Sequence, residues 1–242
     1  MIIALITIII FGLIVLYIAA TTKTNDTEII VGQRRDIKEL GERIQNVLDS
    51  EKIEKKQERK LHSVATEASK LFKKQRLRQS EKKYLSIIKQ DHKNIKAYQG
   101  LGLIYLEQKE YEGAREAFER ICELDPTNDS AFNNLGLSLF NIGKYEEAIK
   151  AYEHSVSLNN KVVHRFLNLA LASQKMADYK KEVSALEHAV DLEPKNIEYI
   201  EELAEAATRA GDNKLAKKTL QKIIEIDPTR LEAQRNLARL KK

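Results

Sequence analysis

Residues that break helices or bridge chains are scarce in this sequence. Its 242 residues include three prolines, nine glycines, one cysteine and no tryptophan. So little proline and glycine disfavours a Gly/Pro-rich linker or a β-sandwich with many tight turns, and it favours helices. The single cysteine, Cys122, excludes an internal disulfide. Cys122 lies in an apolar run, and we expect a small buried hydrophobe rather than a reactive thiol.

Motifs for catalysis and metal binding are missing as well. The five histidines are scattered, and no HExxH or CxxC motif groups histidine or cysteine at metal-ligand spacing. The sequence contains no glycine-rich phosphate loop and no GxSxG motif. It therefore predicts no metal site, no cofactor and no enzymatic activity.

Charged side chains are absent from residues 1–22 and unevenly spread over the rest. The 19 basic and 12 acidic residues of 23–94 give a net charge of +7, whereas the 22 basic and 24 acidic residues of 95–242 give −2. The basic character of the chain therefore belongs to the region that follows the uncharged segment.

The uncharged segment is also strongly apolar from residue 2 to residue 20. As a helix, this run spans about 28 Å, close to the roughly 30 Å hydrocarbon core of a bilayer. We therefore expect residues 1–22 to be a transmembrane signal-anchor helix. A signal peptide cleaved after Ala20, which would give a secreted protein, stays open as the alternative, although the run is long for one and no basic residue precedes it.

Positive charge predicts how such an anchor would be oriented. Lys23, Arg34, Arg35 and Lys38 follow the apolar run, and no lysine or arginine lies before it. Because basic residues near a span stay on the cytoplasmic side, we expect the N-terminus outside and the rest of the protein in the cytoplasm, bound to the cell membrane by one span.

Residues 23–60 read as a polar linker followed by a charged stalk helix over 35–60. Apolar residues at 3-4-3 spacing form a narrow stripe from Ile37 to Val47. Two heptads are too few to predict a stable coiled coil. The stripe is therefore interpreted as packing on the following domain, with self-association of two chains as the alternative.

The rest of the chain repeats every 34 residues. Pro126, Pro194 and Pro228, the only prolines, lie 68 and 34 residues apart, and Leu101 and Tyr111 have counterparts at the same period. A fixed period of this length indicates units that cannot bury their apolar faces alone and stack on their neighbours. We expect units at 95–128, 129–162, 163–196 and 197–230, each with two helices joined by a short turn.

Small residues mark the points where helices approach or end. The first helices carry a small residue at the same place in each unit (Gly102, Gly136, Ala170, Ala204). Gly143 and Gly211 stand where a left-handed residue commonly ends a helix. We expect the second helices to end at Asp125-Pro126, Asn159-Asn160, Glu193-Pro194 and Asp227-Pro228, because the residue before a proline is pushed out of the helical region. Glu182 replaces a small residue, so we expect looser packing there.

These residues resemble the tetratricopeptide repeat (TPR) family, notably Leu135-Gly136, Tyr145-Glu146-Glu147-Ala148 and Asp125-Pro126. The resemblance implies an all-α fold, a right-handed α-solenoid of helix pairs. A degenerate fifth unit fits 61–94, which makes five units over 61–230. Residues 231–242 fit the polar-faced capping helix that closes such a stack.

The resemblance further implies that the first helices line a concave groove for a peptide segment of a partner protein. Leucine and phenylalanine would bury apolar side chains of the peptide, and asparagine would pair with its backbone. The groove residues expected are Gln99, Leu103, Leu106, Asn133, Asn134, Leu137, Phe140, Leu167, Asn168, Leu171 and Gln174.

Two charged clusters flank this groove in the sequence. The acidic cluster of Glu198, Glu201, Glu202 and Glu205 predicts a partner that is basic at that end, unless the cluster is only a solvated face. It also disfavours a clamp for a terminal carboxylate, which acidic residues would repel.

The basic cluster consists of Lys70, Lys73, Lys74, Arg76, Arg78, Lys82 and Lys83. It is either a solvated face or a contact for anionic lipid or an acidic protein. Nucleic acid is the weakest option, because aromatic residues for stacking are few here.

Taken together, these patterns predict a membrane-anchored TPR adaptor or scaffold. It would bind a peptide segment of a partner in its groove and recruit that partner to the membrane. A self-associating structural component of a membrane-bound assembly is the alternative.

Overall fold

The computed structural model describes residues 12–14 and 27–240, with side chains from residue 38 onward in the second range. Every regular element in these ranges is a helix, and none is a strand. The chain divides into two compact units, residues 1–63 and 64–242. Within the described ranges, no helix is both long and apolar enough to cross a bilayer. The expected transmembrane helix over 1–22 lies outside them except for 12–14.

Helix α2 runs without interruption from Thr27 to Lys73 and belongs to both units. We expected a polar linker, a stalk helix over 35–60 and a separate first helix of the 61–94 unit. One helix covers all of this region from residue 27 onward, because no proline and no turn sequence occurs between residues 27 and 73, whereas residues 23–26 of the expected linker lie outside the described residues. Its last turns pair with α3, where the hydroxyl of Ser80 donates to the carbonyl of Ala68 at 2.8 Å.

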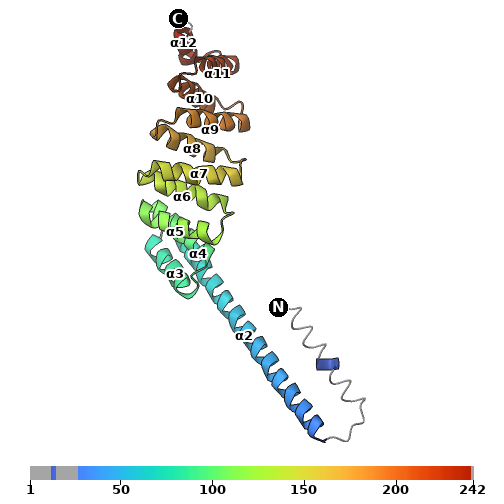
Figure 1. The fold of residues 1–242 in the computed structure, drawn as a ribbon. Helices are drawn as coiled ribbons and strands as arrows, with labels where there is room; N and C mark the ends of the chain where they lie inside the picture. Colours follow the sequence, from blue (N-terminus) through green and yellow to red (C-terminus); the bar gives the residue numbers. More distant parts are fainter. Residues whose placement is uncertain (1–11, 15–26, 241–242) are drawn as a thin grey trace. The chain divides into compact units, whose positions relative to one another are not determined.

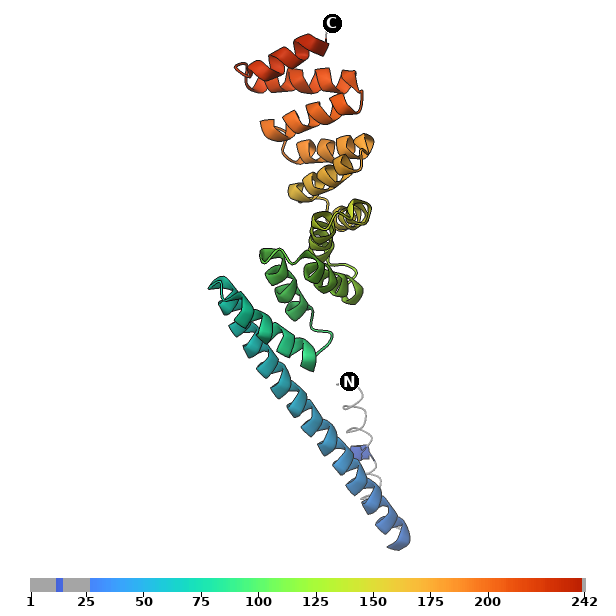
Figure 2. The same cartoon turned by 90° about the vertical axis from the view of Figure 1, so that its left-hand side faces the viewer.

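The second unit is an all-α solenoid of antiparallel helix pairs, which Figures 1 and 2 show stacked in chain order. Equivalent helices begin 34 residues apart, so the period of the sequence is also the period of the structure. After α3 (Leu77–Gln90), the pairs are α4 (Ile95–Glu107) with α5 (Tyr111–Leu124), α6 (Asp129–Asn141) with α7 (Tyr145–Leu158), α8 (Val163–Lys175) with α9 (Tyr179–Leu192), and α10 (Ile197–Arg209) with α11 (Asn213–Ile226). Helix α12 (Leu231–Leu240) follows the last pair.

The turn inside each pair contains one residue in the left-handed region. Gly143 and Gly211 have φ angles of +83° and +75°, which confirms the expected helix ends. The same place in the other units is held by Gln75, Lys109 and Ala177, with φ between +55° and +60°. The second helices end at Leu124, Leu158, Leu192 and Ile226, each directly before the residue pair expected to stop it.

Glycine permits close contact between the helices of a pair, as expected. A Cβ atom on Gly136 would lie 2.7 Å from the ring of Tyr152, and one on Gly102 would lie 2.8 Å from the ring of Phe118. Both rings are almost fully buried in the stack. The core therefore lies mainly between the first and second helices, and exposed residues such as Leu103 and Leu171 stand on the first helices away from it.

Candidate functional site

All the expected groove residues lie on the first helices α4, α6 and α8, and three of them, Leu106, Phe140 and Leu167, also pack against the core. Leu103 and Leu171 are exposed, at 36% and 46% of their surface. Leu137 and Phe140 are only half-buried, and the ring of Phe140 lies 5.3 Å from that of Tyr145. Of the apolar residues expected in the groove, only Leu103 and Leu171 are therefore exposed. Among the others, Gln99 is exposed and Leu106, Leu167 and Gln174 are half-buried.

The asparagines of the first helices bind one another across the repeat boundary. The Nδ2 of Asn168 on α8 donates to the Oδ1 of Asn133 on α6 at 3.1 Å. Asn133 also lies 3.5 Å from the Oδ1 of Asn134 and is only 9% exposed. Asn133 thus positions its neighbours, while Asn134 and Asn168 are half-buried at the surface. In the preceding repeat, Gly100 breaks the series, because the ring of Tyr84 fills the space that a side chain would need.

A hollow of about 360 Å³ lies between α8, α9 and α10. Its rim includes the half-buried amide of Asn168 and the exposed Leu171. Its remaining lining residues are Leu167, Ala170, Gln174, Glu182, Leu186, Glu202, Glu205 and Arg209.

The most buried charge in this hollow is Glu182, which is 2% exposed. Its Oε1 accepts a hydrogen bond from Arg209 at 2.6 Å and another from Gln174 at 3.0 Å. Its Oε2 is buried without any hydrogen-bond partner. We expected this residue to loosen the packing of its unit; instead the helices enclose it, and it joins α9 to α10. The sequence did indicate an ion pair here. A glutamate stands where other units have a small buried residue, and a buried carboxylate needs a positively charged partner.

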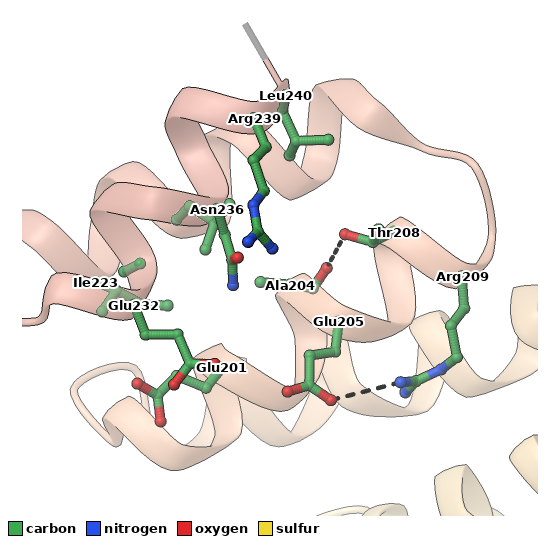
Figure 3. A pocket seen from close by; sticks show the side chains of 12 residues that line it. Glu201, Ala204, Glu205, Thr208, Arg209, Ile223, Glu232, Asn236, Arg239 and Leu240 are labelled. Carbon is green, nitrogen blue, oxygen red and sulfur yellow. Dashed lines mark hydrogen bonds and ion pairs between the residues drawn. The ribbon is translucent and has the colours of Figure 1, made fainter. Parts of the chain in front are cut away.

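A second hollow, of about 430 Å³, lies on the other side of α10, between α10, α11 and α12 (Figure 3). It shares Glu205 and Arg209 with the first hollow. Asn236 and Arg239 of α12 line it opposite α10, and the hydroxyl of Thr208 donates to the carbonyl of Ala204 at 2.8 Å. The first-helix face is therefore recessed on both sides of α10.

Hollows also occur on the second-helix face, of about 520 Å³ between α7 and α9 and about 680 Å³ between α9 and α11. Their rims carry many exposed charged side chains, such as Lys180, Glu187 and Glu225. None of their lining residues has a buried polar atom without a partner. The first-helix face is thus the one that combines exposed leucines, amides and an unsatisfied buried carboxylate.

Comparison with protein families identifies the repeats. Models described as TPR repeat and tetratricopeptide repeat match residues 102–143, 130–161, 163–196 and 197–230, which together are more than half of the chain. The chain is a TPR protein. The last two matches have the same bounds as two of the units expected from the sequence.

Solved structures show the same fold. A crystal structure of MamA protein is 22% identical, with a TM-score of 0.64 over 71% of this chain and 94% of that chain. The crystal structure of YrrB, described as a TPR protein with an unusual peptide-binding site, is 19% identical with a TM-score of 0.61, over 71% and 89%. Pseudomonas aeruginosa PilF is 17% identical with a TM-score of 0.55, over 74% and 82%. No curated protein matches the chain.

The acidic cluster of this TPR protein is partly neutralised. Glu205 lies 3.4 Å from Arg209, and Glu201 lies 3.7 Å from Arg230. The sequence did not predict either arginine as a partner of this cluster, because neither lies in a run of basic residues. Glu198 and Glu202 are exposed and have no ion pair within the described ranges. Although Glu202 is exposed, its carboxylate is partly desolvated, and this effect, followed by repulsion from Glu205 and Glu198, raises the pKa of Glu202.

The basic cluster lies at the other end of the solenoid, on the end of α2, the following turn and α3. Lys83 binds Glu67 at 2.8 Å. The other six members are exposed, and the structure forms no ion pair to them in the ranges it describes.

Cys122 is half-buried, and burial raises the pKa of its thiol to about 12. This thiol is therefore protonated at neutral pH and is a poor nucleophile.

Proposed function

We propose that this TPR protein is a membrane-anchored adaptor that binds an extended peptide segment of a partner protein along its first-helix face. The observation that carries the proposal is the combination around α8 and α10, where the exposed Leu171 and the half-buried amide of Asn168 border a hollow. Apolar side chains of the peptide would pack against the leucines, and the side-chain amides would form hydrogen bonds with its backbone. The similarity to YrrB, a TPR protein described as having a peptide-binding site, supports a peptide as ligand for this fold.

We propose binding rather than catalysis for this face. Its side chains are leucines, amides and carboxylates, and the buried carboxylate is held by an arginine. The one hydroxyl among the residues that line the two hollows, that of Thr208, donates its hydrogen bond to the carbonyl of Ala204 and not to a carboxylate. The protein would then need no cofactor to act.

The groove is tested by changing exposed leucines to glutamate. We expect Leu103→Glu/Leu171→Glu to reduce partner capture by the full-length chain at least tenfold, because a charge would have to be buried against the peptide. The matched control is Leu158→Glu/Leu192→Glu, which alters two leucines of similar exposure, 38% and 39%, on second helices. The readout is affinity purification from membranes with mass spectrometry. Equal capture by the groove variant and the control would contradict the proposed binding face.

The anchor is proposed from residues 2–20, an apolar run without a charged side chain. With Lys23, Arg34 and Arg35 on its C-terminal side, the solenoid would lie in the cytoplasm and hold its partner at the cell membrane. We expect the full-length chain to stay in the membrane pellet after carbonate extraction and a variant without residues 2–20 to be released. Release of both chains would contradict the anchor, and N-terminal sequencing would detect cleavage after Ala20.

Self-association is the second candidate function. Three apolar side chains of α2 are exposed in the first unit: Val47 at 40%, Leu48 at 36% and Ile53 at 65%. The three point in different directions around the helix, so a contact between two copies of α2 would bury Ile53, the most exposed of them, rather than all three. Light scattering of the full-length chain in detergent should then give a dimer that Ile53→Glu weakens, whereas a monomer at every concentration would contradict this candidate.

A further inference from the structure

We propose that the hollow between α8, α9 and α10 is a specificity pocket for one basic side chain, arginine or lysine, of the bound peptide. This inference rests on the proposed peptide-binding function and adds the chemistry of the partner.

The charge of the lining residues favours a cation. Three glutamates and one arginine line the hollow, namely Glu182, Glu202, Glu205 and Arg209. The hollow beyond α10 is closer to neutral, with three glutamates and two arginines. An excess of negative charge in a recess attracts cations more strongly than the same charges on a flat surface. A peptide that lies along the first helices would therefore place its basic residue beside α10.

The buried carboxylate is an independent observation that points to the same ligand. Both hydrogen bonds to Glu182 reach its Oε1, from Arg209 and Gln174, and its Oε2 has no partner. A buried polar atom without a partner costs free energy, more so when it is part of a charged group. A cation bound in the hollow, which Glu182 lines, would offset part of this cost through its charge.

The carboxylates of Glu202 and Glu205, which line the same hollow as Glu182, are also not fully balanced by positive charge. Partial desolvation of its carboxylate and repulsion from Glu205 and Glu198 raise the pKa of Glu202, and Arg209 opposes this effect only in part. Arg209 is shared between Glu182 and Glu205, at 2.6 and 3.4 Å. A bound guanidinium or ammonium group would stabilise the ionised form of Glu202.

The shape and the apolar wall of the hollow fit a long basic side chain better than a metal ion. Leu167, Leu171 and Leu186 line it beside the glutamates, so the methylene stem of an arginine or lysine can contact leucine while its head meets the carboxylates. Within the described residues, no group of three histidine, cysteine, aspartate or glutamate side chains could hold a metal ion. The volume of about 360 Å³ is sufficient for one such side chain.

The first test uses small probes on the full-length chain, in which leucine methyl groups carry carbon-13. We expect n-butylguanidinium and n-butylammonium to shift the methyl resonances of Leu167 and Leu171 in a saturable manner, and butyrate to leave them unchanged. Glu202→Gln/Glu205→Gln should weaken the binding of both cations about five- to tenfold. Both glutamates are exposed, so these substitutions are compatible with the fold.

The matched control is Glu187→Gln/Glu225→Gln, which removes two exposed carboxylates from the second-helix face. We expect it to bind the cations as the unchanged chain does. Absence of a saturable shift, equal affinity of the two double variants or an equal response to butyrate would each overturn the pocket.

A second test separates the pocket from the groove itself. From a library of random ten-residue peptides, the full-length chain should select peptides enriched in arginine or lysine at one position, and Glu202→Gln/Glu205→Gln should select peptides without that enrichment. Peptides selected by the unchanged chain without a basic residue would overturn the pocket and leave the peptide-binding face standing. Recovery of no peptide would contradict the peptide-binding face, and the butylguanidinium titration would still decide whether the hollow takes a cation.

Discussion

At the residue scale, five left-handed turn residues repeat every 34 positions, but only two of them are glycine. Ala177 and Lys109 have φ angles of +55° and +60°. A residue with a Cβ atom in this region is destabilised by roughly 1–2 kcal/mol relative to glycine. The fold therefore tolerates this cost in three of its turns.

We predict that Ala177→Gly raises the free energy of unfolding by about 0.5–1 kcal/mol. Glycine removes the strain of an alanine with a positive φ angle, and this gain exceeds the loss that comes from the greater conformational entropy of the unfolded chain. Urea denaturation followed by circular dichroism measures it. The control is Ala210→Gly, at a helix end with a φ of −73°, where glycine should destabilise. Equal effects at both positions would contradict the explanation.

The Glu182–Arg209 pair gives a second prediction at this scale. Arg209→Met should lower the free energy of unfolding by about 2–4 kcal/mol, because it leaves a charge buried without compensation. Adding Glu182→Ala should recover most of that loss, since alanine stands at the same place in other units, as at Ala148 and Ala216. A double-mutant cycle by urea denaturation measures the coupling, and strictly additive effects would show that the pair is not coupled.

At the scale of elements, consecutive first helices are tied together by a buried charge. Arg165 on α8 is 5% exposed, and its Nη1 donates to the Oδ2 of Asp129 on α6 at 2.7 Å. Asn159 donates to the same oxygen at 2.6 Å. These hydrogen bonds from Arg165 and Asn159 lower the pKa of Asp129 from 3.8 to about 2.

This depressed pKa makes the stability of the stack depend on pH. The folded state holds the ionised carboxylate more tightly than the unfolded chain, so the contribution is present above about pH 4 and is lost as the pH falls toward 2. Asp129→Asn should therefore lower the melting temperature at neutral pH, by the equivalent of about 1–2 kcal/mol. The difference in melting temperature between Asp129→Asn and the unchanged chain should become smaller as the pH falls from about 4 to about 2. A difference that stays constant across this range would contradict the role of Asp129.

Close contact inside the pairs gives another prediction at this scale. Gly136→Ala should destabilise the protein by about 1–3 kcal/mol, because the new Cβ atom would lie 2.7 Å from the ring of Tyr152. Gly41→Ala in α2 is the control. Among the described residues, none outside the adjoining stretch of α2 comes within 4 Å of a Cβ atom there, so alanine should be neutral or stabilise the helix by up to about 1 kcal/mol. Thermal unfolding compares the two, and a neutral Gly136→Ala would refute the tight contact.

Local patterns in the sequence account for the helix pairs but not for the contacts between them. The period, Gly136 and Gly143 are visible because each depends on residues close in the chain. The pairs Arg209 with Glu182 and Arg165 with Asp129 are not, because their partners lie 27 and 36 residues apart. The continuity of α2 was missed for another reason: the expected boundary at residue 60 came from the repeat period, which says nothing about whether a helix must end there.

At the scale of the whole molecule, three features of the chain bear on the proposed function: an apolar run at residues 2–20, a basic cluster on α2 and α3, and a first-helix face recessed around α10. The first would bind the membrane and the third a peptide of a partner protein. The basic cluster has six exposed members without ion pairs in the described ranges, and its binding to an anionic lipid or an acidic protein stays a prediction.

The most direct test of the peptide-binding face is site-specific photo-crosslinking in cells. A photoreactive phenylalanine derivative replaces Leu171 on α8 or, as the control, Leu192 on α9; the two leucines are 46% and 39% exposed. We expect the probe at position 171 to form an adduct with one partner, mapped by mass spectrometry to a single short segment, and the probe at position 192 to form none. Adducts with that segment from position 192 alone, or equally from both positions, would contradict the peptide-binding face.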